Sequence, residues 1–181
     1  GLAIWDSFFK LGVTPVGIET YANSRRLEKS LRLQNADLEI DYNLYEAGLA
    51  RPKVKAADFH GKEAYVQQRE LDEQAAYLCT FVLHDTTDSN GVVRYPVGNW
   101  PILDPASKEV IIDAHGRRSY TTSMAFGPSL GVNIAMGYLP TNKAKEGDTV
   151  LIEYFGEHYE AKVMKVGYGA LLDPTNERPK S

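Results

Sequence analysis

The stretch from Gly116 to Pro140 limits what this chain can fold into more than any other. Its sequence is GRRSYTTSMAFGPSLGVNIAMGYLP, in which small and hydroxyl-bearing residues precede Gly127-Pro128 and an apolar run from Val132 to Leu139 follows. Glycine tolerates positive φ and proline presets the next φ near a turn value, so the dipeptide predicts a sharp reversal. The pattern therefore predicts a strand, a tight turn and a buried strand, as found in β-barrels.

Other short apolar runs, separated by Gly and Pro, extend this β pattern. Residues 157–166 alternate apolar and polar, and Gly156-Glu157 before them predicts a two-residue hairpin loop of type II′. Six or more short strands at this spacing favour a small barrel or sandwich. The further strands are predicted at 76–84, 92–97, 100–103, 110–112 and 149–155.

The first 70 residues predict helices instead. Trp5, Phe8 and Phe9 share one face of a helix over 2–11, which we expect to dock on a core. A second short helix carries Leu27 and Leu31 inward, and Asp58 is positioned to cap a third helix beginning at residue 59. The polar segment 67–74 follows and is a good domain boundary.

Four cations lie on the second helix: Arg25, Arg26, Lys29 and Arg32. A solvated face held by salt bridges explains most such charges, and Glu28 precedes Arg32 by four residues in the favourable orientation. The alternative is that one or two of them contact an anionic ligand.

Composition excludes several function classes. The chain has 181 residues and a net charge of −4, which argues against a nucleic-acid or anionic-membrane surface. No apolar run approaches the roughly 20 residues of a transmembrane helix. The one cysteine, Cys79, excludes an internal disulfide and fits a reducing compartment. We therefore expect a soluble, cytoplasmic protein.

Catalytic motifs are absent from the sequence. The four histidines lie far apart without cysteine or carboxylate at ligand spacing, so no metal site is expected. No serine lies in a G-x-S-x-G elbow, and no glycine-rich loop joins a strand to a helix. Cys79 is better interpreted as a small buried apolar residue than as a nucleophile. The residues alone do not indicate an enzyme or name a catalytic residue.

Several motifs in order resemble the C-terminal part of the glycine cleavage T-protein (aminomethyltransferase) superfamily. Members of that family carry Ala-Arg-Asp-x-Leu-Arg-Leu-Glu, Pro-x-Glu-Ala-Gly-Leu and Lys-x-Asp-Phe-x-Gly-Lys/Arg-Glu-Ala, then a hydroxyl-rich barrel strand and a final Asp-Pro-x-Asn. The similar segments here are YANSRRLE (Tyr21 to Glu28), NLYEAGL (Asn43 to Leu49), KAADFHGKEA (Lys55 to Ala64), the 116–140 stretch and LDPTNER (Leu172 to Arg178).

The resemblance implies an α+β fold in two parts. Residues 1–70 would be the C-terminal end of a folate-binding aminomethyltransferase domain, made of helices and short strands. Residues 71–181 would be an antiparallel β-barrel domain. The implied cofactor is tetrahydrofolate, and most of the pterin pocket would lie in a missing N-terminal domain of the same protein. We therefore expect the full-length protein to be an enzyme and this fragment alone to be inactive.

One departure from the family motif guides the choice of reaction. Aligning on Arg26-Leu27-Glu28 puts Ala22 where the family has its ligand-contacting arginine, and a methyl group cannot hold a carboxylate. The run Arg25 to Leu38 resembles tetrahydrofolate-dependent O-demethylases, which move a methyl group from a methoxylated aromatic acid such as vanillate or syringate to folate.

An O-demethylase is thus the predicted function, with an aromatic methoxy acid and tetrahydrofolate as small-molecule partners. The resemblance implies Arg26 and Arg178 as folate contacts and Tyr21 as a residue lining the pocket. The alternatives are a glycine cleavage aminomethyltransferase, the folate-binding tail of a dimethylglycine or sarcosine dehydrogenase, and a non-catalytic folate-binding relative. The last of these lacks support, because the aligned DFHGKEA has no cysteine of the Lys-Gly-Cys-Tyr-x-Gly-Gln signature.

Overall fold

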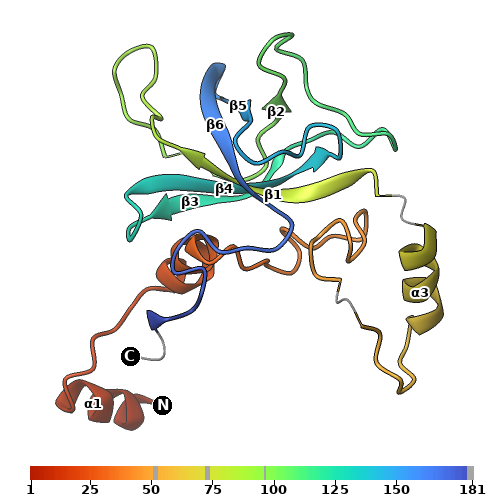
Figure 1. The fold of residues 1–181 in the computed structure, drawn as a ribbon. Helices are drawn as coiled ribbons and strands as arrows, with labels where there is room; N and C mark the ends of the chain where they lie inside the picture. The colour runs from red at the N-terminus through yellow and green to blue at the C-terminus, as the bar shows by residue number, and fades with distance from the viewer. Residues whose placement is uncertain (51–52, 72–73, 96, 179–181) are drawn as a thin grey trace.

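A six-stranded antiparallel sheet forms the centre of the molecule (Figure 1). The computed structural model describes residues 1–50, 53–71, 74–95 and 97–178. The strand order is β2-β5-β6-β1-β4-β3. The strands are β1 (Ala76–Leu83), β2 (Ile102–Leu103), β3 (Thr121–Gly127), β4 (Val132–Pro140), β5 (Thr149–Tyr154) and β6 (Glu157–Val166).

The sheet curls until its two ends meet. Ile102 N donates to the carbonyl oxygen of Ser119 at 3.0 Å, and Thr121 N donates to that of Trp100 at 2.8 Å. These bonds join the chain around β2 to the start of β3, the two outermost strands in the sheet order. The result is a curled antiparallel sheet, so the barrel predicted from the sequence is confirmed at this level.

Both faces of the central strands are buried, which explains why β1 and β4 are almost continuously apolar. Phe81 and Leu83 of β1 point into the barrel and belong to its core. Leu78 of β1 and Ile134 and Met136 of β4 form a second cluster with Leu27, on the outer face of the sheet. The chain before β1 therefore covers one side of the sheet.

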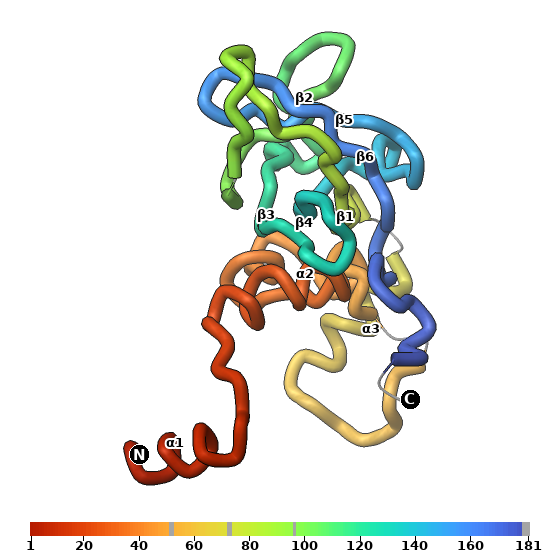
Figure 2. Tube along the Cα trace, turned by 90° about the vertical axis from the view of Figure 1, so that its left-hand side faces the viewer, coloured from red at the N-terminus to blue at the C-terminus, as the bar shows by residue number. Residues whose placement is uncertain are grey.

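The helical segments lie below the sheet (Figures 1 and 2). They are α1 (Leu2–Lys10), a π-helical turn η1 (Thr20–Arg25), the single turn α2 (Arg26–Glu28) and α3 (Lys62–Leu71). Leu27 in α2 is fully buried, as predicted, whereas Leu31 lies beyond the helix and is exposed. α3 begins at Lys62 rather than at residue 59, because residues 59–61 form a turn and Gly61 has φ +81°.

The helix α1 does not dock on the core. It forms where predicted, but it has no buried residue, and Figure 2 shows it well away from the sheet. The exposed fractions of Trp5, Phe8 and Phe9 are 53%, 52% and 47%. The periodicity correctly predicted a helix with an apolar face, but the expected packing partner is not among the residues that the structure describes. None of the described helices is both long and apolar enough to span a membrane.

Two turns differ from the predicted chemistry. Gly127 does not have positive φ; its role is steric, because a Cβ there would lie 2.5 Å from Ile134 Cδ1. In the β5–β6 hairpin the two loop residues are Phe155 and Gly156, with φ +51° and +75°. Two positive φ values indicate type I′ rather than type II′. The segments 92–95 and 110–112 contribute isolated bridges instead of strands.

Shortening Ile134 tests the outer face of the sheet. Ile134 is fully buried against Leu27 and the 127–131 turn. Ile134→Val removes one methyl group, and we expect it to lower the free energy of unfolding by about 0.5–1.5 kcal/mol. Urea denaturation measures the loss. No change in the denaturation midpoint would show that this face is not packed as described.

Candidate functional site

A buried ion pair fastens the segment before β1 to the barrel. Arg26 NH1 lies 2.7 Å from Asp37 Oδ2, and both side chains are almost completely buried. Arg26 NH2 donates to Ser123 Oγ of β3 at 2.7 Å. Asp37 also accepts hydrogen bonds from Leu33 N and from the Thr122 hydroxyl. The hydroxyl-rich strand of the sequence thus supplies polar partners on the outer face of the sheet.

Three of the four predicted surface cations bond other parts of the protein through all of their side-chain nitrogens. All three guanidinium nitrogens of Arg26 donate to an acceptor, and so do those of Arg32, which bonds backbone carbonyls. Lys29 Nζ bonds Asp173 and Asn176 of the tail. The predicted salt bridges are therefore confirmed for Arg26 and Lys29, whereas Arg32 bonds backbone carbonyls and Glu28 pairs with Arg25 instead.

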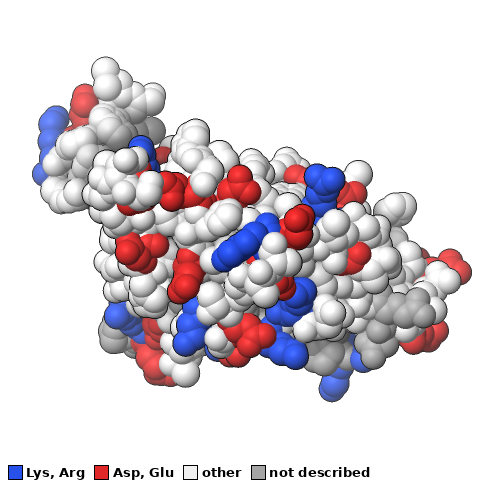
Figure 3. Space-filling model, turned by 90° about the horizontal axis from the view of Figure 1, so that it is seen from above, with Lys and Arg blue, Asp and Glu red and all other residues white. Residues whose placement is uncertain are grey.

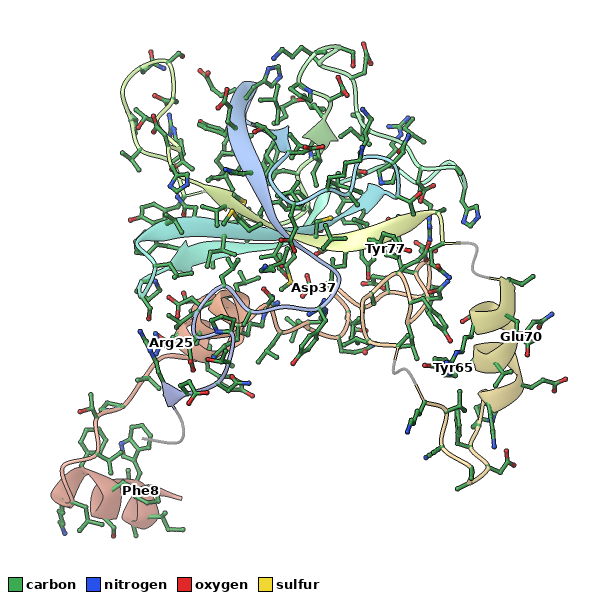
Figure 4. All side chains as sticks on the ribbon, in the orientation of Figure 1. Phe8, Arg25, Asp37, Tyr65, Glu70 and Tyr77 are labelled. Atoms are coloured by element: carbon green, nitrogen blue, oxygen red, sulfur yellow. The ribbon has the colours of Figure 1, made fainter. Side chains whose placement is uncertain are left out.

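Arg25 is the exception among the four. Its NH1 donates to Glu28 Oε2 at 3.1 Å and to Ser129 Oγ in the β3–β4 turn at 2.6 Å. Its Nε and NH2 donate to no described residue, and its side chain is 52% exposed. Figure 4 shows Arg25 on η1 below the end of the β3–β4 pair.

The three residues predicted to contact the cofactor differ in burial and in their hydrogen bonds. Arg26 is buried, and each of its guanidinium nitrogens donates within the protein. Tyr21 is 77% exposed on η1, one turn before Arg25. Arg178 is exposed in the tail, where its N–H donates to Asp173 Oδ2 at 3.3 Å. That Arg26, Arg178 and Tyr21 contact folate remains a prediction.

A second polar cluster was not recognised from the sequence. Arg117 pairs with Glu46 and with Asp113, each at 2.6 Å, and its guanidinium lies 4.2 Å from the centroid of Tyr42. Tyr42 in turn stacks on Tyr138 of β4, with ring centroids 3.5 Å apart. This cluster clamps the loop at residues 42–46 onto the barrel. Glu46 and Arg117 are 71 residues apart, so no local pattern could have paired them.

The two carboxylates of this cluster have lowered pKa values. Burial alone raises the pKa of Glu46, but hydrogen bonds from Arg117 and from the N–H groups of Asn43 and Ala75 outweigh it. Burial likewise raises the pKa of Asp113, but hydrogen bonds from the backbone N–H and the guanidinium of Arg117 outweigh burial and lower it. Both carboxyl groups therefore stay ionised in the folded protein to lower pH than in the unfolded chain.

Acid should consequently destabilise the fold through this cluster. A carboxyl whose folded pKa is depressed contributes stability above its unfolded pKa, about 4, and loses it as pH falls through the folded pKa. We expect the free energy of unfolding to fall below about pH 4, and Arg117→Met to make the fall shallower. Urea denaturation at pH 7, 5, 4 and 3 measures this. An equally steep fall in Arg117→Met would contradict the assignment.

The rest of the described surface has mixed charge and one further cavity of note. Seen from above, positive and negative side chains are interspersed over the barrel (Figure 3). A cavity of about 400 Å³ beside β6 contains His84 and His158. The described residues include no group of three or more His, Cys, Asp or Glu able to hold a metal ion. Cys79 is buried, and burial raises its pKa to about 12, so it is no nucleophile.

A comparison with protein families finds a match for the barrel. Residues 101–166 match the family model "Glycine cleavage T-protein C-terminal barrel domain". This part of the chain is therefore similar to such a domain. The match spans β2 to β6 and therefore includes Ser123 of β3 and Ser129 of the β3–β4 turn.

Curated relatives extend the similarity to the rest of the chain. An aminomethyltransferase of Prochlorococcus marinus (strain MIT 9303) is 30% identical over 167 residues, covering 91% of this chain and 40% of the relative. One of Francisella tularensis subsp. tularensis (strain WY96-3418) is 26% identical over 164 residues, covering 89% and 40%. The chain thus spans 40% of the length of these relatives.

A solved structure shares the fold. The glycine cleavage system aminomethyltransferase T from Bartonella henselae superposes with a TM-score of 0.61, at 24% identity. The superposition covers 79% of this chain and 36% of that one. At this identity the likeness concerns the fold, which includes the segment before β1 as well as the barrel.

Proposed function

We propose that this chain is the C-terminal portion of a tetrahydrofolate-dependent aminomethyltransferase. The observation that carries the proposal is similarity to aminomethyltransferases over 91% of the chain, including the helical segment and not only the barrel. In this role the barrel and the segment at 20–50 would form one wall of a folate site completed by the remaining length that such relatives have.

The relatives support this function better than the predicted O-demethylase. Those reported above are named aminomethyltransferases, and none of them is named an O-demethylase. The O-demethylase prediction rests on Ala22, where an arginine is absent, and on the run Arg25 to Leu38. In the structure Ala22 lies in η1 and its carbonyl oxygen accepts from Arg26 Nε. The transfer assays described below include the O-demethylase reaction as one possible outcome.

The residues of this chain fit a ligand such as tetrahydrofolate in part. Tetrahydrofolate joins a flat pterin to an acidic glutamate tail, so it needs apolar or aromatic surface and hydrogen-bond donors. The exposed side of η1 carries an aromatic ring at Tyr21 and open donors at Arg25. It carries no enclosed pocket for the pterin, which we assign to the part of the relatives' length that this chain does not span.

A pair of transfer assays tests the proposal. The whole protein that contains this chain is given tetrahydrofolate and either an aminomethylated lipoyl carrier or vanillate under anoxic conditions. We expect ammonia and methylenetetrahydrofolate from the carrier. If 5-methyltetrahydrofolate appears from vanillate and the carrier is not used, the O-demethylase is correct and the proposal is wrong.

Binding to the 181-residue chain alone is a separate measurement. We expect calorimetric titration with tetrahydrofolate to show weak binding or none, because the pterin surface is incomplete. Micromolar or tighter affinity would show that the site lies within this chain and would contradict the division of the pocket proposed above.

A further inference from the structure

The donors of Arg25 and Ser129 converge at one place on the surface. Arg25 NH1 donates to Ser129 Oγ at 2.6 Å, which leaves the hydroxyl hydrogen of Ser129 without an acceptor among the described residues. The Nε and NH2 groups of Arg25 are also open, and both residues are exposed. Three N–H or O–H groups are thus available beside one another, at the seam between η1 and the β3–β4 turn.

A buried carboxylate holds these donors in place. Glu28 is fully buried, and each of its oxygens is used: Oε1 accepts from Ser129 N at 2.6 Å and Oε2 accepts from Arg25 NH1 at 3.1 Å. The backbone oxygen of Glu28 accepts from the N–H groups of Leu171 and Leu172. Glu28 is held through both carboxylate oxygens and its backbone oxygen. Because Arg25 bonds this fixed carboxylate, its side chain loses little conformational freedom when a ligand binds.

The open edge of Arg25 suits a carboxylate. A guanidinium has five N–H donors in a planar fork, so it can serve one carboxylate through NH1 and a second through the parallel Nε and NH2 groups. The exposed Tyr21, four residues earlier, lies on the same side of the helical turn.

We propose that Arg25 and Ser129 form a binding site for a carboxylate group of a ligand, with Tyr21 beside it. The proposal depends on the proposed function only for the source of the carboxylate, which would be the aliphatic tail of tetrahydrofolate or an aromatic acid. The geometry itself requires only a carboxylate that approaches from the side of η1.

Nuclear magnetic resonance of arginine side chains tests the site without turnover. The ¹⁵N-labelled 181-residue chain is titrated with glutarate, as a probe for the aliphatic tail, and separately with benzoate, as a probe for an aromatic acid. Arg94 is the internal reference, because it is 45% exposed and its Nε already donates to Asp88 at 2.8 Å. We expect a saturable shift of the Arg25 Nε–H signal at concentrations that leave Arg94 unchanged.

Variants identify the groups responsible. Arg25→Leu, followed through the backbone N–H signal of Ser129, should weaken binding about tenfold or more, since hydrogen bonds to a charged group are strong. Arg25→Lys should restore only part of it. Ser129→Ala should also weaken binding, and Arg94→Leu should not. Amide spectra of each variant confirm that it is folded.

Each outcome decides the proposal. Tighter binding of glutarate or of benzoate identifies the source, and either supports a carboxylate site. Equal, unsaturable shifts at Arg25 and Arg94 with both probes, or unchanged binding in Arg25→Leu, would overturn it. Because no transfer is measured, failure of this site is distinguishable from failure of the aminomethyltransferase assay.

Discussion

Replacing Asp37 by alanine should cost about 3–5 kcal/mol of unfolding free energy, the usual result of removing one partner from a buried ion pair. Asp37 is fully buried and accepts from Arg26, Leu33 N and Thr122. Without it the guanidinium of Arg26 keeps its positive charge in the same dry place between η1 and β3. Urea denaturation at pH 7 measures the loss.

The exposed pair of Lys165 and Glu146 is the control for this prediction. It also joins one cation to one carboxylate, but its side chains are 34% and 52% exposed and its closest atoms are 3.3 Å apart. Glu146→Ala should therefore cost less than about 1 kcal/mol. The double variant Arg26→Met, Asp37→Leu should recover much of the stability, because an apolar pair leaves no unpaired charge. If Asp37→Ala costs no more than Glu146→Ala, the pair is not buried as described.

The strands could be predicted because their signals are local. The turn at Gly127-Pro128 and the alternation in β6 each depend on neighbours in sequence, and the almost unbroken apolar run of β1 reflects burial on both faces. The helix α1 was also predicted from its period. Its period does not say whether the apolar face is covered, and among the described residues it is not.

The site was less predictable because its partners are distant in sequence. The motif predicts a ligand contact for Arg26, but it could not predict the bonds from its guanidinium to Asp37 and to Ser123, which is 97 residues away. Arg25, which keeps open donors, looks the same as Arg26 in the sequence. The two arginines differ in the number of acceptors around each guanidinium, which only the structure shows.

The motif NLYEAGL shows the same limitation. Asn43 Oδ1 accepts from the N–H groups of Tyr45 and Glu46, and Glu46 accepts from Ala75 N, Ala76 N and Arg117. Through these hydrogen bonds the segment connects the helical part of the chain to β1. Its resemblance to a family motif predicted the fold, whereas the physical reason for each residue appears only in three dimensions.

Gly48, the glycine of that motif, should tolerate no side chain. Its φ is +67°, and a Cβ there would lie 2.6 Å from Gly167 Cα and 2.7 Å from Gly167 C, where β6 leads into the tail. The obstacle is backbone, so it cannot rotate away. We expect Gly48→Ala to cost about 2–5 kcal/mol, of which about 1–2 comes from the left-handed conformation and the rest from the clash.

Gly131 separates these two contributions. Its φ of +71° is nearly the same, but nothing lies within 4 Å of the Cβ position. Gly131→Ala should therefore cost only the conformational part, about 1–2 kcal/mol. Urea denaturation of both variants gives the difference. Because the additional loss in Gly48→Ala comes from contact with Gly167, equal losses in the two variants would show that the 42–50 loop and the end of β6 are not in contact.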